Sequence, residues 1–219
     1  PQFRSSAASD VYKRQALVFS LTLFGITNKA YAAKLTMYCS VEIDVCEMLE
    51  QAYEKETGTK VAMTRASSGE TFAKIKAEAS NPKGDVWFGG TGDPHLTAAQ
   101  ENLTEKYKSV HFNDLLPAAQ NQAKNADFKS VGIYVGALGF GYNKDLLAKK
   151  GLPAPKSWMD LTKPIYKGEI QVANPNSSGT AYTTLATILQ IFGEDKGWDY
   201  MKKLHANINT YTKSGSAPI

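Results

Sequence analysis

The sequence is poor in the residues that most often build catalytic and metal centres. Its 219 residues include two cysteines and three histidines, and the histidines are scattered along the chain at His95, His111 and His205. No C-x-x-C or H-E-x-x-H pattern occurs, which argues against a zinc site. The nucleophile pattern G-x-S-x-G and the phosphate-loop pattern G-x-x-x-x-G-K-[ST] are absent as well. We therefore expect a protein that is not an enzyme and that holds neither a metal nor a cofactor.

An excess of charge of one sign is also missing. The chain has 25 Lys and Arg against 21 Asp and Glu, and four of the cations and one of the acids precede residue 33. The remainder is nearly neutral, with 21 cations against 20 acids. Nucleic-acid binders usually present a basic face, and no dense Lys/Arg cluster with interleaved aromatic residues occurs. We expect no nucleic-acid partner.

The longest apolar run, from Ala16 to Ile26, is too short for a membrane-spanning helix, which needs about twenty residues. Two cations precede it and the small-residue sequence Ala30-Tyr31-Ala32 follows, as in a secretory signal peptide. Residues 1–15 resemble a translated linker. We therefore predict that residues 1–32 are a non-native leader plus a signal peptide, and that the protein is exported to the periplasm. The end at Ile219, where a turn should lead into another helix, suggests a fragment.

From Lys34 onward, strands and helices alternate. Short apolar strands are predicted at 35–39, 60–64 and 85–88, each followed by a segment with helical spacing. Such alternation is typical of a parallel sheet with right-handed crossovers. A polar connection is expected over 113–130. Residues 33–130 are therefore predicted to form a first α/β lobe.

The segment over 131–142 is glycine-rich, and we predict an extended strand or hinge that crosses to a second lobe over 143–219. In that lobe we expect a short helix with Trp158 and Leu161, a strand over 169–173, helices over 180–192 and 195–204, and a strand over 208–211. The second lobe is expected to be incomplete.

Two turns with similar sequences each follow a strand and open a helix. They are Arg65-Ala-Ser-Ser-Gly69 and Ser177-Ser-Gly-Thr180. The first amides of a helix have no partner inside the helix and carry partial positive charge, so such turns suit an anion. Either turn taken alone is equally consistent with ordinary helix capping. Ligands of open α/β sheets bind beyond the carboxyl ends of the strands, and the pair therefore favours a site.

The candidate ligand-binding residues are those at predicted strand ends and helix starts, together with one aromatic residue beside the second turn: Ser40, Ser67, Ser68, Gly69, Gly90, Thr91, Ser177, Ser178, Gly179, Thr180 and Tyr182. Among the other aromatic residues, Trp87 is expected to pack in the core or at its rim. Cys39 and Cys46 are close enough in sequence for a disulfide in an exported protein, although two buried thiols fit equally well.

Several blocks resemble one known family. They are TMYCSVEIDVCEMLE, RASSGETFAKIKAE, GDVWFGG, ALGFGYNKDLL and ANPNSSGTAYTTLATI. They are similar to periplasmic solute-binding proteins of ABC importers, in the ferric-iron-type subclass, and most resemble a hexose-phosphate-binding member. The resemblance covers nearly all of residues 34–219, and the two cysteines fit it. It implies two α/β lobes that close on a ligand, a type II-like periplasmic binding protein, with an ABC permease as partner and a monomeric state.

The resemblance also implies two possible classes of ligand, ferric iron and an anionic organic solute. Iron binders of this family often have an acid just after the third strand, where this chain has Gly89, Gly90 and Thr91, and their tyrosine pair belongs to a part not present here. Because a trivalent cation needs anionic oxygen ligands, we favour an anionic organic solute such as a sugar phosphate. Ferric iron is the alternative, with Tyr38, Glu42 and Asp44 as possible oxygen ligands. An α/β hydrolase or transferase is the least favoured function, because Ser178 has no base nearby in the sequence.

Overall fold

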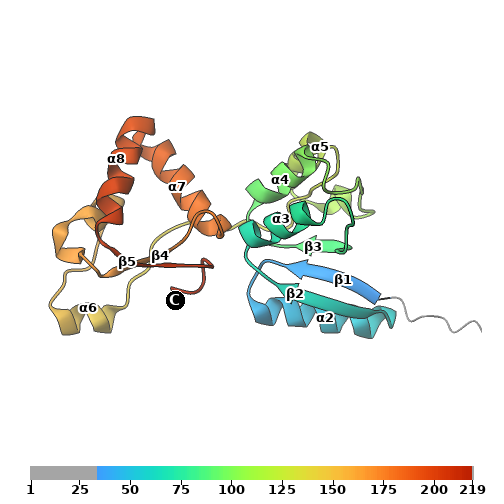
Figure 1. The fold of residues 1–219 in the computed structure, drawn as a ribbon, viewed down its shortest axis with the longest axis horizontal. Helices are drawn as coiled ribbons and strands as arrows, with labels where there is room; N and C mark the ends of the chain where they lie inside the picture. Colours follow the sequence, from blue (N-terminus) through green and yellow to red (C-terminus); the bar gives the residue numbers. More distant parts are fainter. Residues whose placement is uncertain (1–33, 219) are drawn as a thin grey trace, which may run out of the picture. The chain divides into compact units, whose positions relative to one another are not determined.

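The computed structural model describes residues 34–218, and its first part is a three-stranded parallel sheet (Figure 1). The strands are β1 (Lys34–Cys39), β2 (Lys60–Arg65) and β3 (Val86–Phe88), in the order β2-β1-β3. β1 pairs with β2 from Lys34↔Lys60 to Cys39↔Arg65, and with β3 up to Cys39↔Phe88. The carboxyl ends of all three strands therefore lie at one edge of the sheet.

The helices that connect these strands begin and end at residues with local signals. Helix α2 (Ile43–Thr57) stops at Gly58, which has a left-handed backbone with φ of 70°. Glycine adopts this conformation without strain because it has no side chain. Helices often end with a glycine in this conformation. Helix α3 (Ser68–Ala77) begins after Ser67, whose amide donates to the Glu70 carboxylate over 3.2 Å. This bond satisfies a donor at the start of the helix.

The connection over 113–130, for which the sequence predicts only a polar surface connection, contains a helix. After α4 (Gly92–Gln100) come a 3-10 turn, η1 (Phe112–Asp114), and α5 (Pro117–Asn125). α5 starts with proline, which favours the first helical turn, and buries Ala123. The sequence analysis missed this helix because small alanines, rather than large apolar residues, mark its buried face.

The segment over 131–142, expected to be a crossing strand or a hinge, forms neither strand nor helix in the structure, so the strand is wrong and the hinge stays a prediction. A strand needs a neighbour for its backbone hydrogen bonds, and the glycines here weaken an isolated one. Helix α6 (Lys144–Lys150), which the sequence analysis did not predict, follows directly. The Asn143 side chain caps it by accepting a hydrogen bond from the Leu146 amide over 2.9 Å.

The second sheet has two parallel strands, β4 (Ile170–Ala173) and β5 (Ile208–Thr212). Helices α7 (Gly179–Phe192) and α8 (Glu194–His205) connect them and pack against each other (Figure 1). These four elements match their predicted positions to within one residue at each end. The predicted class, α/β with parallel sheets, is confirmed. Residues 34–219 form one compact unit that contains both sheets.

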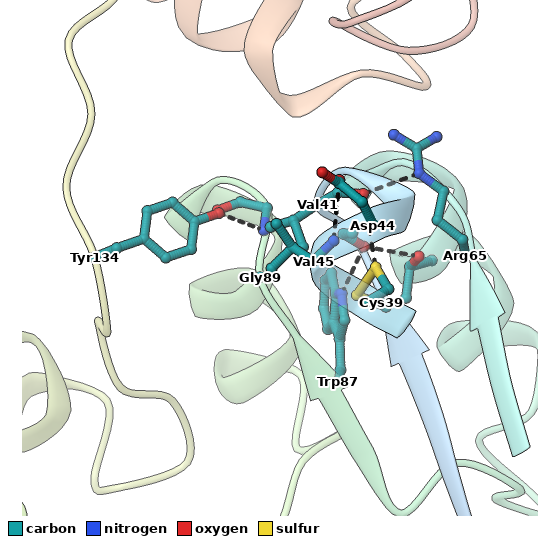
Figure 2. The surroundings of a disulfide bond; sticks show 12 residues. Cys39, Val41, Asp44, Val45, Arg65, Trp87, Gly89 and Tyr134 are labelled. Carbon is teal, nitrogen blue, oxygen red and sulfur yellow. Dashed lines mark hydrogen bonds between the residues drawn. A yellow bond between two sulfur atoms is a disulfide. The ribbon is translucent and has the colours of Figure 1, made fainter. Parts of the chain in front are cut away.

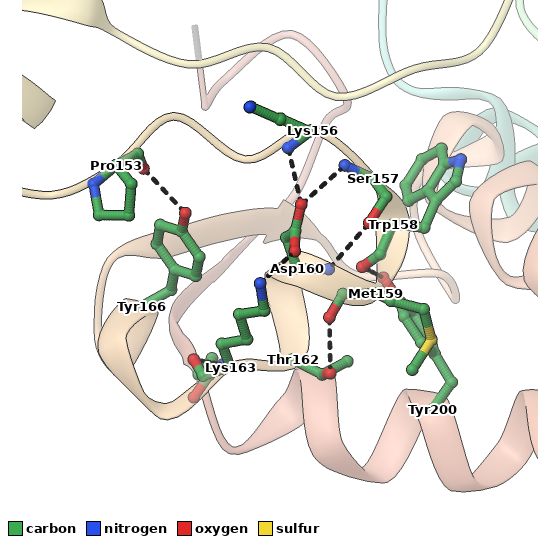
Figure 3. A network of polar contacts seen from close by, with 11 residues as sticks. Pro153, Lys156, Ser157, Trp158, Met159, Asp160, Thr162, Lys163, Tyr166 and Tyr200 are labelled. Carbon is green, nitrogen blue, oxygen red and sulfur yellow. Dashed lines mark hydrogen bonds and ion pairs between the residues drawn. The ribbon is translucent and has the colours of Figure 1, made fainter.

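The loop before β4 is held together by Asp160 (Figure 3). Two 3-10 turns make up this loop, η2 (Trp158–Thr162) and η3 (Pro164–Tyr166). Asp160 Oδ2 accepts the amides of Lys156 and Ser157 over 2.8 and 3.0 Å. The ammonium of Lys163 and these amides lower the pKa of Asp160 to about 2. The carboxylate therefore stays charged at any physiological pH and keeps this connection ordered.

Each sheet has its own apolar core. Beside the second sheet the buried residues are Leu161, Ile188, Tyr200 and Leu204. Beside the first they are Met37, Cys39 and Cys46, and the two cysteines form a disulfide with a Cα–Cα distance of 6.0 Å (Figure 2). The disulfide ties the end of β1 to the first turn of α2. Of the two possibilities that the sequence left open, the disulfide is correct.

The predicted leader and signal peptide, residues 1–32, lie outside the described residues. Within the described part of the chain, no helix is both long and apolar enough to cross a membrane.

Candidate functional site

The first predicted anion turn lies at the start of α3, where Ser67 and Ser68 are both buried. The Ser67 hydroxyl oxygen lies 2.6 Å from the Ser177 carbonyl oxygen and 2.7 Å from Glu70 Oε2, so its single proton serves one of them at a time. The Gly69 amide donates to the same Ser177 carbonyl over 3.0 Å. A partly negative oxygen therefore occupies the positive end of α3, as the helix dipole favours.

The second predicted turn lies at the start of α7 and has unused donors. The amides of Ser177 and Ser178 donate to the Asn174 carbonyl, and the Ser178 hydroxyl accepts the Ala181 amide over 3.3 Å. The amides of Gly179 and Thr180, the first two of α7, have no acceptor among residues 34–218. Gly179 is buried, and an unpaired buried amide costs free energy. These two amides are therefore available to an anionic acceptor.

The turn after β3 joins the other two. Gly89 and Gly90 have left-handed backbones, with φ of 77° and 91°, which side chains rarely tolerate. A Cβ atom on Gly90 would lie 2.2 Å from the Ser68 hydroxyl oxygen, and the Thr91 amide donates to that same oxygen over 3.2 Å. Glycine is therefore needed for the β3 turn to approach the α3 turn this closely.

The three turns meet at Ser68, Thr91 and Gly179. A Cβ atom on Gly179 would lie 1.9 Å from Thr91 Oγ1 and 3.1 Å from Ser68 Cβ. Thr91 Oγ1 is buried and has no hydrogen-bond partner in the described part of the chain. Because buried hydroxyls nearly always have a partner, an unpaired one beside two free amides indicates a place for a polar ligand.

Ser40, at the end of β1, is already fully engaged with its neighbours. Its hydroxyl oxygen accepts the Trp87 indole N–H over 2.9 Å and lies 3.1 Å from the Thr71 hydroxyl oxygen. Figure 2 shows the Trp87 indole pointing toward the end of β1. Trp87 is partly buried in β3, as expected for a residue at the rim of the core. Through its hydrogen bond to Ser40, the Trp87 side chain supports the loop that carries Ser40.

Two further side chains fix the Gly89–Gly90 turn from outside. His95 stacks on Trp87 with ring centroids 3.6 Å apart, and its Nε2 lies 2.8 Å from the Gly89 carbonyl oxygen. Burial lowers the pKa of His95 and so favours the neutral ring, and because a carbonyl oxygen only accepts, Nε2 carries the proton that it donates to Gly89. The Tyr134 hydroxyl accepts the Gly90 amide over 2.8 Å and donates to the Gly90 carbonyl (Figure 2). Sequence analysis missed Thr71 and Tyr134, since no local pattern signals contacts 31 and 44 residues apart.

The remaining predicted residues lie at the edge of this group. Ser177 is partly buried and its hydroxyl donates to the carbonyls of Asn174 and Lys213. Thr180 and Tyr182 are exposed, with 48% of Tyr182 accessible to solvent. The structure therefore brings Ser67, Ser68, Gly69, Gly90, Thr91, Ser178 and Gly179 together with the flanking Ser40 and Ser177, and leaves Thr180 and Tyr182 at the surface beside them.

Two of the three oxygen groups named for iron, those of Tyr38 and Asp44, have other partners. Tyr38 is buried and donates its hydroxyl proton to Glu78 over 2.7 Å. Burial and this bond raise the pKa of Tyr38 to about 12, which disfavours the deprotonated form that would ligate a metal. Asp44 accepts the Val45 amide. Among the described residues no group of three or more His, Cys, Asp or Glu side chains is placed to hold a metal ion.

A cavity of about 1120 Å³ lies beside β3 rather than above the three turns. It is lined by Val86 and Trp87 of β3 and by the segment from Phe128 to Tyr134, and it reaches the site at Gly89, Gly90 and Gly92. β3 is the edge strand of its sheet and pairs with β1 alone in the described chain. This cavity follows an open sheet edge and does not define the anion site.

Comparison with known proteins identifies the family. Residues 85–217, more than half of the chain, match the model for bacterial extracellular solute-binding proteins. The chain belongs to this family. An uncharacterised protein of Haemophilus influenzae is 46% identical over 203 residues, which make up 92% of this chain and 58% of the relative.

Solved structures give the same result. The periplasmic binding protein AfuA from Actinobacillus pleuropneumoniae, solved with fructose-6-phosphate bound, superposes with a TM-score of 0.80 at 47% identity. The match covers 84% of this chain and 58% of AfuA. Iron-bound HitA from Pseudomonas aeruginosa has a TM-score of 0.60 at 19% identity, covering 83% of this chain and 56% of HitA, a likeness that shows the fold alone.

These findings confirm the predicted resemblance to ferric-iron-type periplasmic binding proteins, and to the hexose-phosphate binder among them. They also confirm the two-lobed α/β class. The chain spans about 58% of the length of the Haemophilus influenzae relative and of AfuA.

Proposed function

We propose that the protein is the solute-binding component of an ABC importer in the periplasm, and that it captures an anionic small solute between two lobes. A sugar phosphate is the ligand class that we favour. The supporting observation is the meeting of three turns at Ser68, Thr91 and Gly179, with two unused helix amides and an unpaired buried hydroxyl beside them. Neutral donors at a helix start suit a phosphate.

The phosphate oxygens accept hydrogen bonds from the amides of Gly179 and Thr180 and from the Thr91 hydroxyl. Ser40, Ser67, Ser68, Gly69, Gly90, Ser177 and Ser178 shape the surrounding turns, and Tyr182 is placed to contact the sugar. Each hydrogen bond to a charged group contributes about 1.5 to 3 kcal/mol. Three such bonds are sufficient for micromolar affinity, about 8 kcal/mol, when contacts to the sugar offset the costs of association.

The partners and location follow from the same role. Residues 33–130 and 143–219 form the two lobes, with 131–142 as the hinge. The partner is the inner-membrane permease, the protein acts as a monomer, and it has no nucleic-acid ligand and no turnover. The disulfide between Cys39 and Cys46 supports an oxidising compartment such as the periplasm.

Isothermal titration of the full-length protein tests this function. Fructose-6-phosphate, inorganic phosphate, fructose and ferric citrate are titrated separately into the purified protein. We expect micromolar or tighter binding of fructose-6-phosphate, weaker binding of inorganic phosphate, and no heat from fructose. Phosphorus NMR of the mixture should show the sugar phosphate intact after hours. Binding of ferric citrate alone would favour the iron alternative and contradict our proposal.

A further inference from the structure

Arginine is used once in residues 34–219, whereas lysine is used twenty times. The single arginine, Arg65, is the last residue of β2 and comes two residues before Ser67. Lysine is a flexible point charge that suits a solvated surface, whereas guanidinium is a planar fork that binds two oxygens of one phosphate or carboxylate. The one arginine is therefore located where strands end and ligands bind in α/β folds.

The guanidinium of Arg65 is held in a defined place. Its Nε donates to the Val41 carbonyl over 3.0 Å, and the residue is half-buried. Figure 2 shows the two terminal nitrogens beyond the carboxyl ends of β1 and β2, pointing away from the sheet. With Nε fixed by a neutral carbonyl, the terminal N–H groups remain free to donate. The side chain therefore loses little additional conformational freedom when it binds an anion.

Val41 links Arg65 to the turns of the site. Val41 follows Ser40, and its Cγ1 would lie 2.4 Å from a Cβ atom on Gly89. The loop that receives the Arg65 hydrogen bond thus packs directly against the Gly89–Gly90 turn. The guanidinium is positioned by the same backbone that positions Ser40 and the β3 turn.

The charge of Arg65 is not neutralised by a neighbour. No acidic side chain among residues 34–218 is within 4.0 Å of its nitrogens, whereas seven lysines make such ion pairs. The Asp44 carboxylate lies nearby in Figure 2 and accepts the Val45 amide. A fixed, unpaired cation at the carboxyl edge of a sheet favours an anionic ligand.

We propose that Arg65 is the cationic residue of the binding site, and that its terminal nitrogens hold two oxygens of a phosphate-type anion. This proposal rests on the proposed function and adds charge recognition to the neutral donors of the turns. It also implies selectivity for a doubly charged phosphate monoester over an uncharged sugar.

The test compares Arg65→Gln with Lys60→Gln in the full-length protein. Lys60 is on the same strand at the opposite end, is paired with Glu54 over 2.8 Å, and its side chain is 72% exposed. Both changes remove one positive charge. We expect Arg65→Gln to weaken fructose-6-phosphate binding about 30- to 1,000-fold, because truncating one member of a buried charge pair is costly. Lys60→Gln should change the dissociation constant less than about threefold, as is usual for an exposed charge.

Two further measurements separate binding from a structural role. Arg65→Lys keeps the charge but loses the planar fork, so we expect an intermediate loss. In the wild type, affinity should fall as pH drops from 7.5 to 5.5, because the second phosphate proton binds near pH 6. This pH dependence should be weaker in Arg65→Gln, while the melting temperatures of the variants stay close to that of the wild type.

The outcomes distinguish this proposal from the proposed function. If wild-type protein binds fructose-6-phosphate and Arg65→Gln binds it equally well, Arg65 is a loop residue and the inference is wrong. Arg65→Gln could also lose affinity only in proportion to a lowered melting temperature, while Arg65→Lys keeps the affinity and the melting temperature of the wild type. In that case the role of Arg65 is structural, and the inference is wrong. If wild-type protein binds no phosphorylated sugar, the proposed function itself has failed.

Discussion

At the scale of single residues, the site depends on glycines where three turns meet. Gly90 faces Ser68 and Gly179 faces Thr91, at distances that leave no room for a methyl group. The serines and threonines supply donors, but the glycines allow the turns to approach. The close approach of the three turns therefore requires that positions 90 and 179 carry no side chain.

Replacing Gly179 by alanine should separate the turns. The added Cβ would meet Thr91 Oγ1 at 1.9 Å, so either the hydroxyl rotates away or α7 moves. We expect at least a tenfold loss of affinity for fructose-6-phosphate by calorimetry, and a destabilisation of about 1 to 3 kcal/mol in urea unfolding. Equal affinity of Gly179→Ala and the wild type would show that close contact of the turns is not required.

His95 should make stability depend on pH. Burial lowers the pKa of His95, so the unfolded chain binds a proton more readily than the folded protein does. Its stabilising contribution is present above the unfolded value of about 6.5 and is lost as pH falls through the folded value. Urea unfolding between pH 7.5 and pH 5 should show a smaller decrease for His95→Gln than for the wild type. A decrease in His95→Gln equal to that of the wild type would contradict this account.

The sequence allowed much of the site to be predicted, because the turns have local signatures. Ser, Gly and Thr after a strand mark the start of a helix wherever they occur, and their clustering suggested that they meet. The contacts of Tyr134 with Gly90 and of Trp87 with Ser40 join distant parts of the chain, so no local pattern reveals them. Arg65, which we propose as a site residue, is the only arginine after residue 14, and that rarity is a signal readable from the sequence.

At the scale of elements, strands and helices with strong apolar periodicity were predicted to within a residue or two. The failures have physical causes. α5 buries a single alanine, Ala123, and begins with proline, so its sequence resembles a polar loop. α6 has seven residues and none of them is buried, so it left no periodic pattern. The segment over 131–142 has strand-like composition, but a strand forms only when a neighbouring strand pairs with it.

The disulfide should stabilise the first sheet and α2 together. Cys39 ends β1 and Cys46 lies in the first turns of α2, so the bond closes a short loop beside the site. For a loop of about eight residues the chain-entropy model gives about 2.5 kcal/mol. We expect the double variant Cys39→Ser/Cys46→Ser to lose about this much free energy of unfolding in urea.

Wild-type protein measured with a reducing agent serves as the control for the disulfide. Its unfolding curve should approach that of the double variant, while the variant itself should not respond to the reductant. A double variant as stable as the oxidised wild type would show that apolar burial of the two sulfurs, rather than the covalent bond, stabilises this corner.

At the scale of the whole molecule, solute capture requires that two lobes move together around the ligand. Residues 131–142 carry no regular structure, and four glycines give the segment freedom to change its backbone angles. We expect the radius of gyration of the full-length protein in small-angle scattering to decrease when fructose-6-phosphate is added. Fructose at the same concentration should leave it unchanged. An equal response to both sugars would indicate an effect of the solution rather than closure.

In the function that we propose, backbone amides at the start of α7 and the Thr91 hydroxyl bind an anion. The most direct test is a crystal structure of the full-length protein with fructose-6-phosphate. We predict phosphate oxygens within hydrogen-bond distance of the Gly179 and Thr180 amides and of Thr91 Oγ1. A phosphate bound elsewhere, with these donors facing water or the protein's own carbonyl groups, would contradict the account.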